Sequence, residues 1–197
     1  MERSAGTLSS KTQQPDTLKS GGVMRMQIPV LPSGLMEEDM PANRFGHFVS
    51  GDLGEFREQM CNLFNHHNIT SRERQSDAQG FEVGHVDLGG DLMISAVRYD
   101  QKVRIEAPPL DQFFVFQFTL GGNCHNTQGR DQANAAPGTL CVLNWDRPIR
   151  QDMSSGYRQM AVRVSRGLLE NVLEEELGYS VRDPLGFCTE ACPLQAS

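Results

Sequence analysis

One run of residues restricts the possible folds of this chain more than any other. Phe113–Leu120 is the most apolar run in the sequence, and it is bounded by Pro108-Pro109 and by Gly121-Gly122. Its side chains alternate between two faces, with Phe114, Phe116, Phe118 and Leu120 on one and Phe113, Val115, Gln117 and Thr119 on the other. The pattern predicts a strand buried on both sides, which needs a second layer or a closed barrel around it. An apolar wall with a single amide, Gln117, is also typical of a small-molecule pocket.

Further strand-like runs surround this one, separated by turn residues such as Gly89-Gly90 and Pro137-Gly138. The predicted strands are Phe81–Asp87, Asp91–Tyr99, Lys102–Glu106, Phe113–Leu120, Cys124–Gln128, Thr139–Asn144, Pro148–Met153 and Tyr157–Val164. Short strands at near-regular spacing predict a β-sandwich or barrel rather than alternating β and α units. Closure of the sheet also removes exposed strand edges.

A helix is predicted on each side of these strands. The first begins at Asp52, which forms a capping-box-like pair with Glu55, and it ends at His66-His67. Its apolar stripe consists of Phe56, Met60, Leu63, Phe64 and His67. The second helix follows Ser165, a good N-cap residue, and ends at Gly178. Residues 1–45 are rich in Ser, Thr, Gln, Gly and Pro, and we expect them to form a flexible arm.

The charge and composition exclude several classes of protein. The net charge is −7, with no cluster of Lys and Arg, so the chain as it stands is a poor candidate for binding nucleic acid or an anionic membrane. It has neither an apolar run long enough to span a bilayer nor the apolar segment of a secretory signal. Five cysteines, an odd number, predict free thiols in the cytoplasm.

No catalytic motif is present. The sequence lacks G-x-S-x-G and a phosphate-binding glycine loop, and its histidines form neither H-x-H nor H-E-x-x-H. A Gly-Gly turn before a histidine and a later Pro-Gly resemble the cupin pattern, whose enzymes generally bind metal through an H-x-H pair and a further histidine. Here His125 has Thr127 in the partner position, and no histidine follows Pro137-Gly138. We therefore expect no catalytic residue, no metal and no cofactor.

Arginines are the remaining polar candidates for a ligand site. Arg98 continues an apolar strand face after Leu92, Ile94 and Ala96, and Arg158 shares its face with Met160 and Val162. An arginine at the mouth of a barrel can bind a carboxylate in a bidentate manner. The alternative is an arginine that covers the rim of the barrel with its aliphatic stem.

The order of these features resembles the N-terminal effector-binding domain of AraC/XylS-type transcriptional activators, in the subgroup that controls aromatic catabolism. The matching segments are Leu63–His67, Arg98–Ile105, the strand closing on Gly121-Gly122, Pro137–Leu140, Arg147-Pro148 and the helix over 165–178. The resemblance implies a mainly β, cupin-like or jelly-roll barrel without metal, with one helix before it and one or more after it. It also implies dimerising helices and a C-terminal pair of helix-turn-helix motifs, which this chain lacks.

The resulting prediction is a cytoplasmic ligand-sensing domain over residues 46–187, with residues 188–197 as an interrupted end. Its effector is expected to be a small aromatic carboxylate of the benzoate, salicylate or anthranilate class. The residues expected nearest the ligand are His85, Arg98, Phe116, Gln117, Trp145 and Arg158. We expect a homodimer formed through Leu168, Leu169, Val172 and Leu173, with promoter DNA bound only by the missing domain. Two alternatives stay open: a metal-dependent cupin enzyme, and a non-sensing barrel filled by its own side chains.

Overall fold

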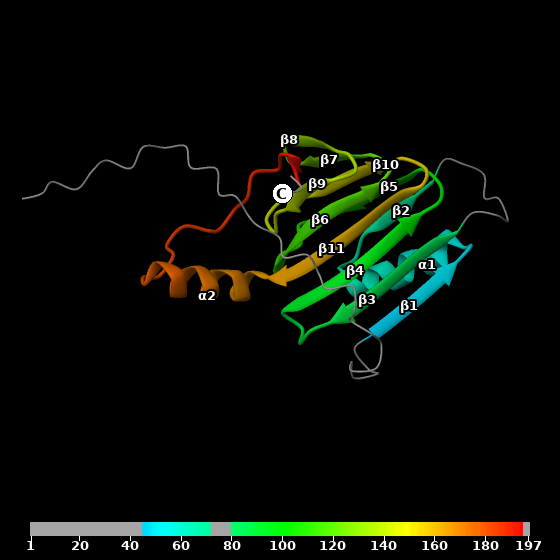
Figure 1. Cartoon of the computed structure of the whole chain (residues 1–197). Helices are drawn as coiled ribbons and strands as arrows, with labels where there is room; N and C mark the ends of the chain where they lie inside the picture. The colour runs from blue at the N-terminus through cyan, green and yellow to red at the C-terminus, as the bar shows by residue number, and fades with distance from the viewer. Residues whose placement is uncertain (1–44, 72–79, 195–197) are drawn as a thin grey trace, which may run out of the picture. The chain divides into compact units, whose positions relative to one another are not determined.

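Two antiparallel sheets form the fold (Figure 1). The computed structural model describes residues 45–71 and 80–194, so all of the predicted arm except Phe45 lies outside the described residues. The larger sheet has the order β1-β3-β4-β11-β6-β9-β12. Its strands are β1 (Phe45–Ser50), β3 (Phe81–Asp87), β4 (Leu92–Tyr99), β11 (Tyr157–Ser165), β6 (Phe113–Gly121), β9 (Thr139–Leu143) and β12 (Cys192–Pro193). The smaller sheet consists of β2 (Asn68–Thr70), β5 (Val103–Ala107), β10 (Ile149–Met153), β7 (Cys124–Gln128) and β8 (Asp131–Ala135), in that order.

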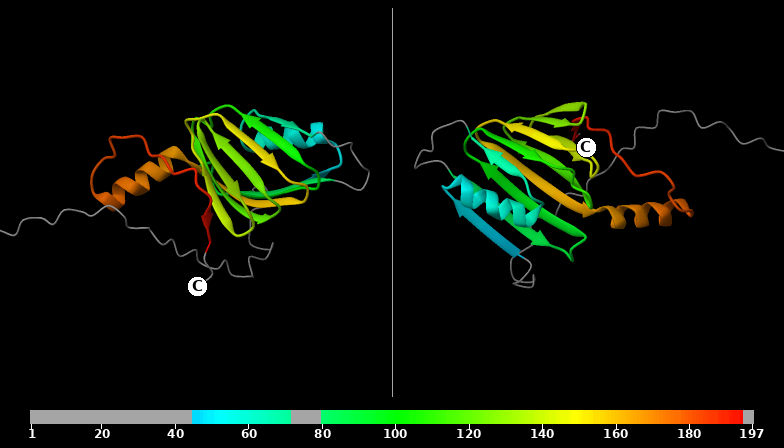
Figure 2. Two further views of the ribbon diagram at one scale, coloured as in Figure 1. Left: turned by 90° about the horizontal axis from the view of Figure 1, so that it is seen from above. Right: turned by 180° about the vertical axis from the view of Figure 1, so that it is seen from behind.

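The two sheets lie face to face, as the view from above shows (Figure 2). Their inward side chains form the core together with Phe56 of the first helix, and this core includes the fully buried rings of Phe56, Phe81, Tyr99 and Tyr157. A second cluster around Leu110, Val115, Leu143, Ile149 and Ala161 continues this core. The predicted mainly β barrel, with a helix before and after its main run of strands, is confirmed.

All eight predicted strands are present, with ends that differ from the prediction by at most one residue. The predicted strands do not include β1, β2, β8 and β12. β8 reads Asp-Gln-Ala-Asn-Ala, which has no β-branched or aromatic residue, and it is extended because it pairs with β7. Such a strand is determined by its tertiary partner, since β-propensity depends strongly on context.

Helix α1 (Leu53–Leu63) begins as predicted and ends earlier. The Asp52 side chain accepts a hydrogen bond from the Glu55 amide at 2.9 Å, as an N-cap should. In a capping box the Glu55 carboxylate would accept a hydrogen bond from the Asp52 amide. Here it accepts one from the Ser50 hydroxyl instead, at 2.8 Å. The prediction that the helix extends to His66-His67 is wrong, because the chain leaves the helix at Phe64 and turns into β2.

Helix α2 (Arg166–Leu177) confirms both of its predicted ends. The Ser165 hydroxyl accepts from the Leu168 amide at 3.1 Å, and Gly178 closes the helix in the left-handed conformation at φ 72°. None of its residues is buried, and Val172 is 48% exposed. Neither helix in the described part of the chain is long and apolar enough to cross a bilayer.

Strand β6 is covered differently on its two faces. Val115, Gln117 and Thr119 point inward and are buried between the sheets. On the outer face, the ring of Phe187 packs edge-on against Phe114 and Phe116, with ring centroids 5.2 and 5.3 Å apart. The expected burial on both sides is therefore confirmed at Phe114 and wrong at Leu120, which is 56% exposed, beyond the reach of this cover.

The outer cover of β6 is a segment near the C-terminus, residues 185–194, which we call the C-terminal strap. Asn144 holds it through both ends of its amide: Oδ1 accepts from the Phe187 amide at 2.7 Å, and Nδ2 donates to the Phe187 carbonyl at 2.9 Å. Trp145 Nε1 donates to the Leu185 carbonyl at 3.2 Å. Beyond residue 187 the strap adds β12 to the larger sheet by pairing Cys192 with Leu140.

Candidate functional site

Three of the buried glutamines lie in one part of the barrel interior, where side chains are expected to be apolar. Gln117 on β6 and Gln159 on β11 face inward from the larger sheet, and Gln151 on β10 faces them from the smaller one. Gln151 Nε2 donates to Gln117 Oε1 at 2.7 Å and to Asn126 Oδ1 at 2.6 Å. Gln159 Oε1 accepts from the Tyr157 hydroxyl at 3.1 Å. The interior is thus a buried amide network, in which every unpaired group is costly.

A cavity of about 50 Å³ lies beside this network. Its polar lining residues are Asn65, His67, Tyr99, Gln117, Gln151 and Gln159. Its apolar lining residues are Met60, Phe64, Ile105, Ala107, Leu110, Val115, Leu143 and Ile149. An apolar wall with a few convergent polar groups is the usual character of a small-molecule site, although ligand-filled pockets are larger. We call this space the inner cavity.

Two buried polar atoms in this region have no hydrogen-bond partner among the described residues. One is the hydroxyl of Tyr99, a fully buried residue that lines the inner cavity, and the other is Nδ2 of Asn126. Burial raises the pKa of Tyr99 far above its ordinary value, so the phenol is neutral. An unpaired buried hydroxyl costs about 1–3 kcal/mol, and such groups are normally satisfied by water or by a ligand.

His67 lines the inner cavity from the turn that follows α1. Its Nδ1 donates to the Asn65 carbonyl at 2.6 Å in the neutral ring, which leaves the Nε2 lone pair as an acceptor. The pKa of His67 lies below its ordinary value, chiefly because burial disfavours the charged ring; the charges of His66 and Arg57 add to this, while the Asn65 carbonyl opposes it. His67 is therefore uncharged at neutral pH.

This lowered pKa predicts how stability depends on pH. Below pH 6.5 the histidine is protonated in the unfolded state, whereas His67 in the folded state stays neutral because its pKa is lower. The unfolded state therefore binds more protons than the folded state. The free energy of unfolding should therefore fall as pH drops below 6.5, by at most about 1.4 kcal/mol per pH unit, until the folded-state pKa is reached. Urea unfolding across this range measures it, and His67→Gln should reduce the slope. Equal slopes in the two proteins would contradict the assignment.

Of the six residues predicted near a ligand, Gln117 lines the inner cavity. Phe116 is its neighbour on β6 and so lies on the opposite, outer face, against Phe187. His85 packs its ring over Gly46 of β1, and Trp145 lies under the guanidinium of Arg166, with the Arg166 Cζ 4.4 Å from the ring centroid. The structure therefore does not gather these residues around one space.

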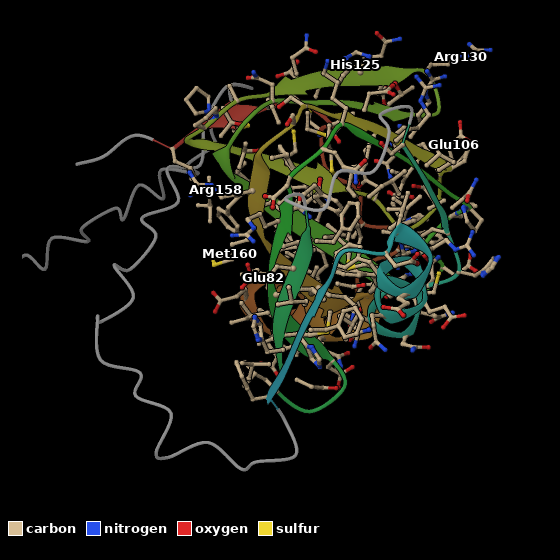
Figure 3. The ribbon with its side chains drawn as sticks, turned by 90° about the vertical axis from the view of Figure 1, so that its right-hand side faces the viewer. Glu82, Glu106, His125, Arg130, Arg158 and Met160 are labelled. Atoms are coloured by element: carbon tan, nitrogen blue, oxygen red, sulfur yellow. The ribbon has the colours of Figure 1, made fainter. Side chains whose placement is uncertain are left out.

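The two predicted arginines are exposed on the outer face of the larger sheet, where Figure 3 shows Arg158. Arg98 forms ion pairs with Glu82 at 3.4 Å and with Asp100 at 3.3 Å. Arg158 is exposed, and its guanidinium lies against the backbone of Gly121. Neither side chain lines the inner cavity, because the alternation along β4 and β11 turns Val97 and Gln159 inward instead.

The predicted site residues do not include Tyr99, Gln151 or Gln159, which line the inner cavity. The available signal was their parity: Gln151 alternates in phase with Ile149 and Met153, and Gln159 with Tyr157 and Ala161. A polar residue that keeps the phase of an apolar face is either a strand irregularity or an interior polar group.

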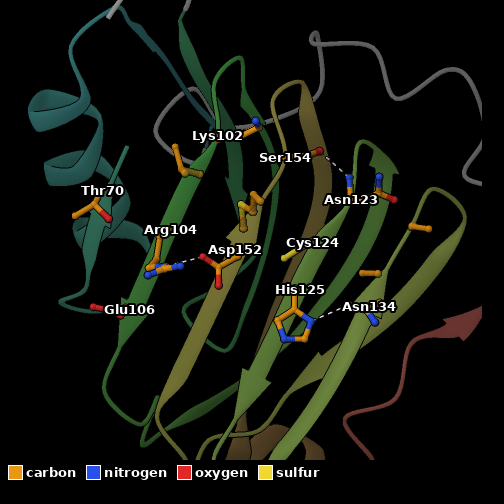
Figure 4. A pocket seen from close by; sticks show the side chains of 14 residues that line it. Thr70, Lys102, Arg104, Glu106, Asn123, Cys124, His125, Asn134, Asp152 and Ser154 are labelled. Atoms are coloured by element: carbon orange, nitrogen blue, oxygen red, sulfur yellow. Dashed lines mark hydrogen bonds and ion pairs between the residues drawn. The ribbon is translucent and has the colours of Figure 1, made fainter. Parts of the chain in front are cut away.

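A larger hollow, an open groove of about 980 Å³, lies on the smaller sheet (Figure 4). Two pairs of its polar side chains bind one another: Arg104 Nε lies 2.5 Å from Asp152 Oδ1, and His125 Nδ1 lies 2.7 Å from Asn134 Oδ1. His125, the histidine in the cupin-like position, thus faces outward. The described residues contain no cluster of three or more His, Cys, Asp or Glu that could hold a metal ion. The inner cavity, with unpaired groups, is the better candidate site.

Comparisons with known proteins agree with the fold. The family model described as the AraC-binding-like domain matches residues 56–196. No curated protein matches the sequence. Among solved structures, the AraC-like transcriptional activator CuxR aligns with a TM-score of 0.53 at 16% identity, over 68% of this chain and 52% of its own. This chain thus spans about half the length of CuxR. An RmlC-like cupin from Shewanella frigidimarina aligns with a TM-score of 0.37 at 10% identity, over 43% of this chain and 73% of its own.

Proposed function

The chain belongs to the AraC-binding-like domain family, and from this premise we propose that its barrel senses a small aromatic effector for a transcriptional activator of the AraC/XylS type. The regulated genes would form a catabolic operon for compounds of the same class. The observation that carries the proposal is the inner cavity, where a fully buried Tyr99 hydroxyl has no partner among the described residues.

The lining of the inner cavity supports an aromatic effector. The rings of Phe64 and Tyr99 and the branched side chains of Leu110 and Ile149 offer flat and apolar contacts. Compounds of the benzoate, salicylate and anthranilate class, with their uncharged derivatives, are the first to test. A cavity of about 50 Å³ is small for such rings, so binding requires the lining to move.

We propose that the domain is not an enzyme and acts in the cytoplasm. The outward direction of His125 and its bond to Asn134 support a barrel without the metal chemistry of cupin enzymes. The rival hypothesis, a metal-dependent cupin enzyme, predicts stoichiometric iron, manganese or zinc in protein purified without chelators, and elemental analysis decides between them. The other rival, a non-sensing barrel, predicts that no small molecule binds.

Signal output is proposed to pass through a homodimer and a separate DNA-binding domain. α2 carries Leu168, Leu169, Val172 and Leu173 with no buried residue, which is consistent with a partner helix covering this stripe. Promoter DNA would be bound by a C-terminal helix-turn-helix domain, as the family resemblance implies. Sedimentation that shows only monomer at every accessible concentration would contradict the dimer.

Calorimetry with a panel of aromatic acids, amides and phenols tests effector binding. Ala107 lines the inner cavity, and Ala107→Leu should fill it and weaken binding at least about tenfold, the effect of roughly 1.4 kcal/mol. The matched control is Ala96→Leu on the exposed face of β4, which should bind like the unchanged protein. Heat from none of the compounds, or equal affinity in both variants, would contradict the proposal.

A further inference from the structure

We infer that the inner cavity takes an uncharged ligand carrying both a hydrogen-bond acceptor and a donor, such as an aromatic carboxamide, alcohol or phenol, rather than a carboxylate ion. The inference rests on the proposed function and narrows its effector class. It differs from the sequence-based expectation of a benzoate-like anion, and three features of the cavity carry it.

The first feature is that no charged side chain lines the inner cavity. Its polar residues are four carboxamides, one neutral phenol and His67, which burial keeps uncharged. A carboxylate taken from water into such surroundings would lose its hydration without gaining a cation. Carboxamide and phenol groups lose far less on the same transfer, because they carry no net charge.

The second feature is that Arg163, the arginine of β11 on the inward side of the strand, already has two binding partners. Arg163 shares the inward parity of Gln159 and Ala161. Its Nη1 donates to the Leu63 carbonyl at the end of α1, at 2.5 Å, and its Cζ lies 5.4 Å from the ring centroid of Phe113. A carboxylate would have to compete with both contacts to recruit this guanidinium.

The third feature is a pair of hydrogen-bonding groups, on two residues that line the inner cavity, with no protein partner among the described residues. The Tyr99 hydroxyl has no partner among the described residues, so it can donate to a ligand carbonyl or hydroxyl oxygen. His67 Nε2 makes no hydrogen bond within residues 45–71 and 80–194, and as the free lone pair of the neutral ring it can accept from a ligand N–H or O–H. A carboxylate ion offers acceptors alone and would leave the His67 lone pair unpaired.

A carboxylic acid can still enter by taking up a proton. At pH 7 an acid with an ordinary pKa near 4 has about 1,000 ionised molecules for each neutral one. If only the neutral form binds, its apparent affinity falls by about that factor. The isosteric amide is neutral at pH 7, so its apparent affinity is not reduced in this way. Benzamide and benzoate, which share a ring and nearly the same volume, therefore isolate the charge.

Calorimetry at pH 7 with benzamide and benzoate, and with anthranilamide and anthranilate, tests the inference. We expect each amide to bind at least about 100-fold more tightly than its acid, somewhat less than the full protonation factor. Tyr99→Phe should weaken benzamide about five- to tenfold by removing one hydrogen bond. It should leave the urea midpoint unchanged or raised, because the lost hydroxyl had no partner among the described residues. Tyr179→Phe, the same change on an exposed tyrosine, is the control.

Each outcome has a distinct meaning. Equal or tighter binding of the acids would overturn the uncharged ligand and leave the proposed sensor intact. Tight amide binding that Tyr99→Phe does not weaken would overturn the inner cavity as its location. Binding by neither series would overturn the proposed function, and the ligand class with it.

Discussion

Replacing Phe56 by alanine should lower the free energy of unfolding by about 3–5 kcal/mol, as expected for a fully buried phenylalanine. The Phe56 ring stacks on Phe81 with centroids 5.2 Å apart and meets Tyr99 edge-on at 5.6 Å. It is one of two buried residues of α1, the other being Met60 in the cavity wall. Its loss leaves a cavity and removes the main contact that fixes α1 on the barrel.

Urea unfolding followed by circular dichroism measures this loss. The matched control is Phe45→Ala at the start of β1, where the side chain is 51% exposed, and its cost should stay within about 1 kcal/mol. A cost for Phe56→Ala no larger than that of the control would show that α1 is not anchored through this ring.

Replacing Asn144 by alanine should cost about 2–4 kcal/mol and release the C-terminal strap. The fully buried amide makes three side-chain hydrogen bonds: two to the backbone of Phe187, and one from Nδ2 to Gln128 Oε1 at 3.3 Å. Phe187 would lose its backbone hold and lie on β6 through ring contacts alone. The strap and the inner cavity share this strand, because Val115 and Gln117 line the cavity from its other face.

Hydrogen exchange separates the local effect from the global one. Amides of residues 185–194 should exchange faster in Asn144→Ala than the loss of global stability alone predicts, because the strap opens before the barrel does. Asn134→Ala, which removes one exposed bond to His125, is the control and should leave the strap protected. Unchanged protection of the strap in Asn144→Ala would contradict the role of this amide.

The strands could be predicted because their signals are local. Apolar alternation with Gly and Pro turns placed eight strands to within a residue, and Ser165 and Gly178 marked both ends of α2. β8 carries no such signal and exists through its pairing with β7. The early end of α1 was missed for a similar reason, since the apolar stripe continues past Phe64 while the chain leaves the helix to form β2.

Of the residues that line the inner cavity, the sequence-based prediction named only Gln117. An arginine in phase with apolar residues looks the same in sequence whether its face is inner or outer, and Arg98 and Arg158 are both on the outer face. Tyr99 could not be predicted for a different reason: an aromatic residue in a strand is expected to be buried, and nothing in the sequence indicates that its hydroxyl lacks a partner. Recognising it required the positions of every potential partner.

The alternation along Phe113–Leu120 can be read from the sequence alone, and with it the fact that Phe116 and Gln117 lie on opposite faces of one strand. Which of the two faces is the interior depends on the packing of distant segments. Gln151 from the opposite sheet bonds Gln117, while Phe187, distant in sequence, covers Phe114 and Phe116 from outside. Alternation is a local property of the strand backbone, whereas burial depends on which distant segments pack against each face.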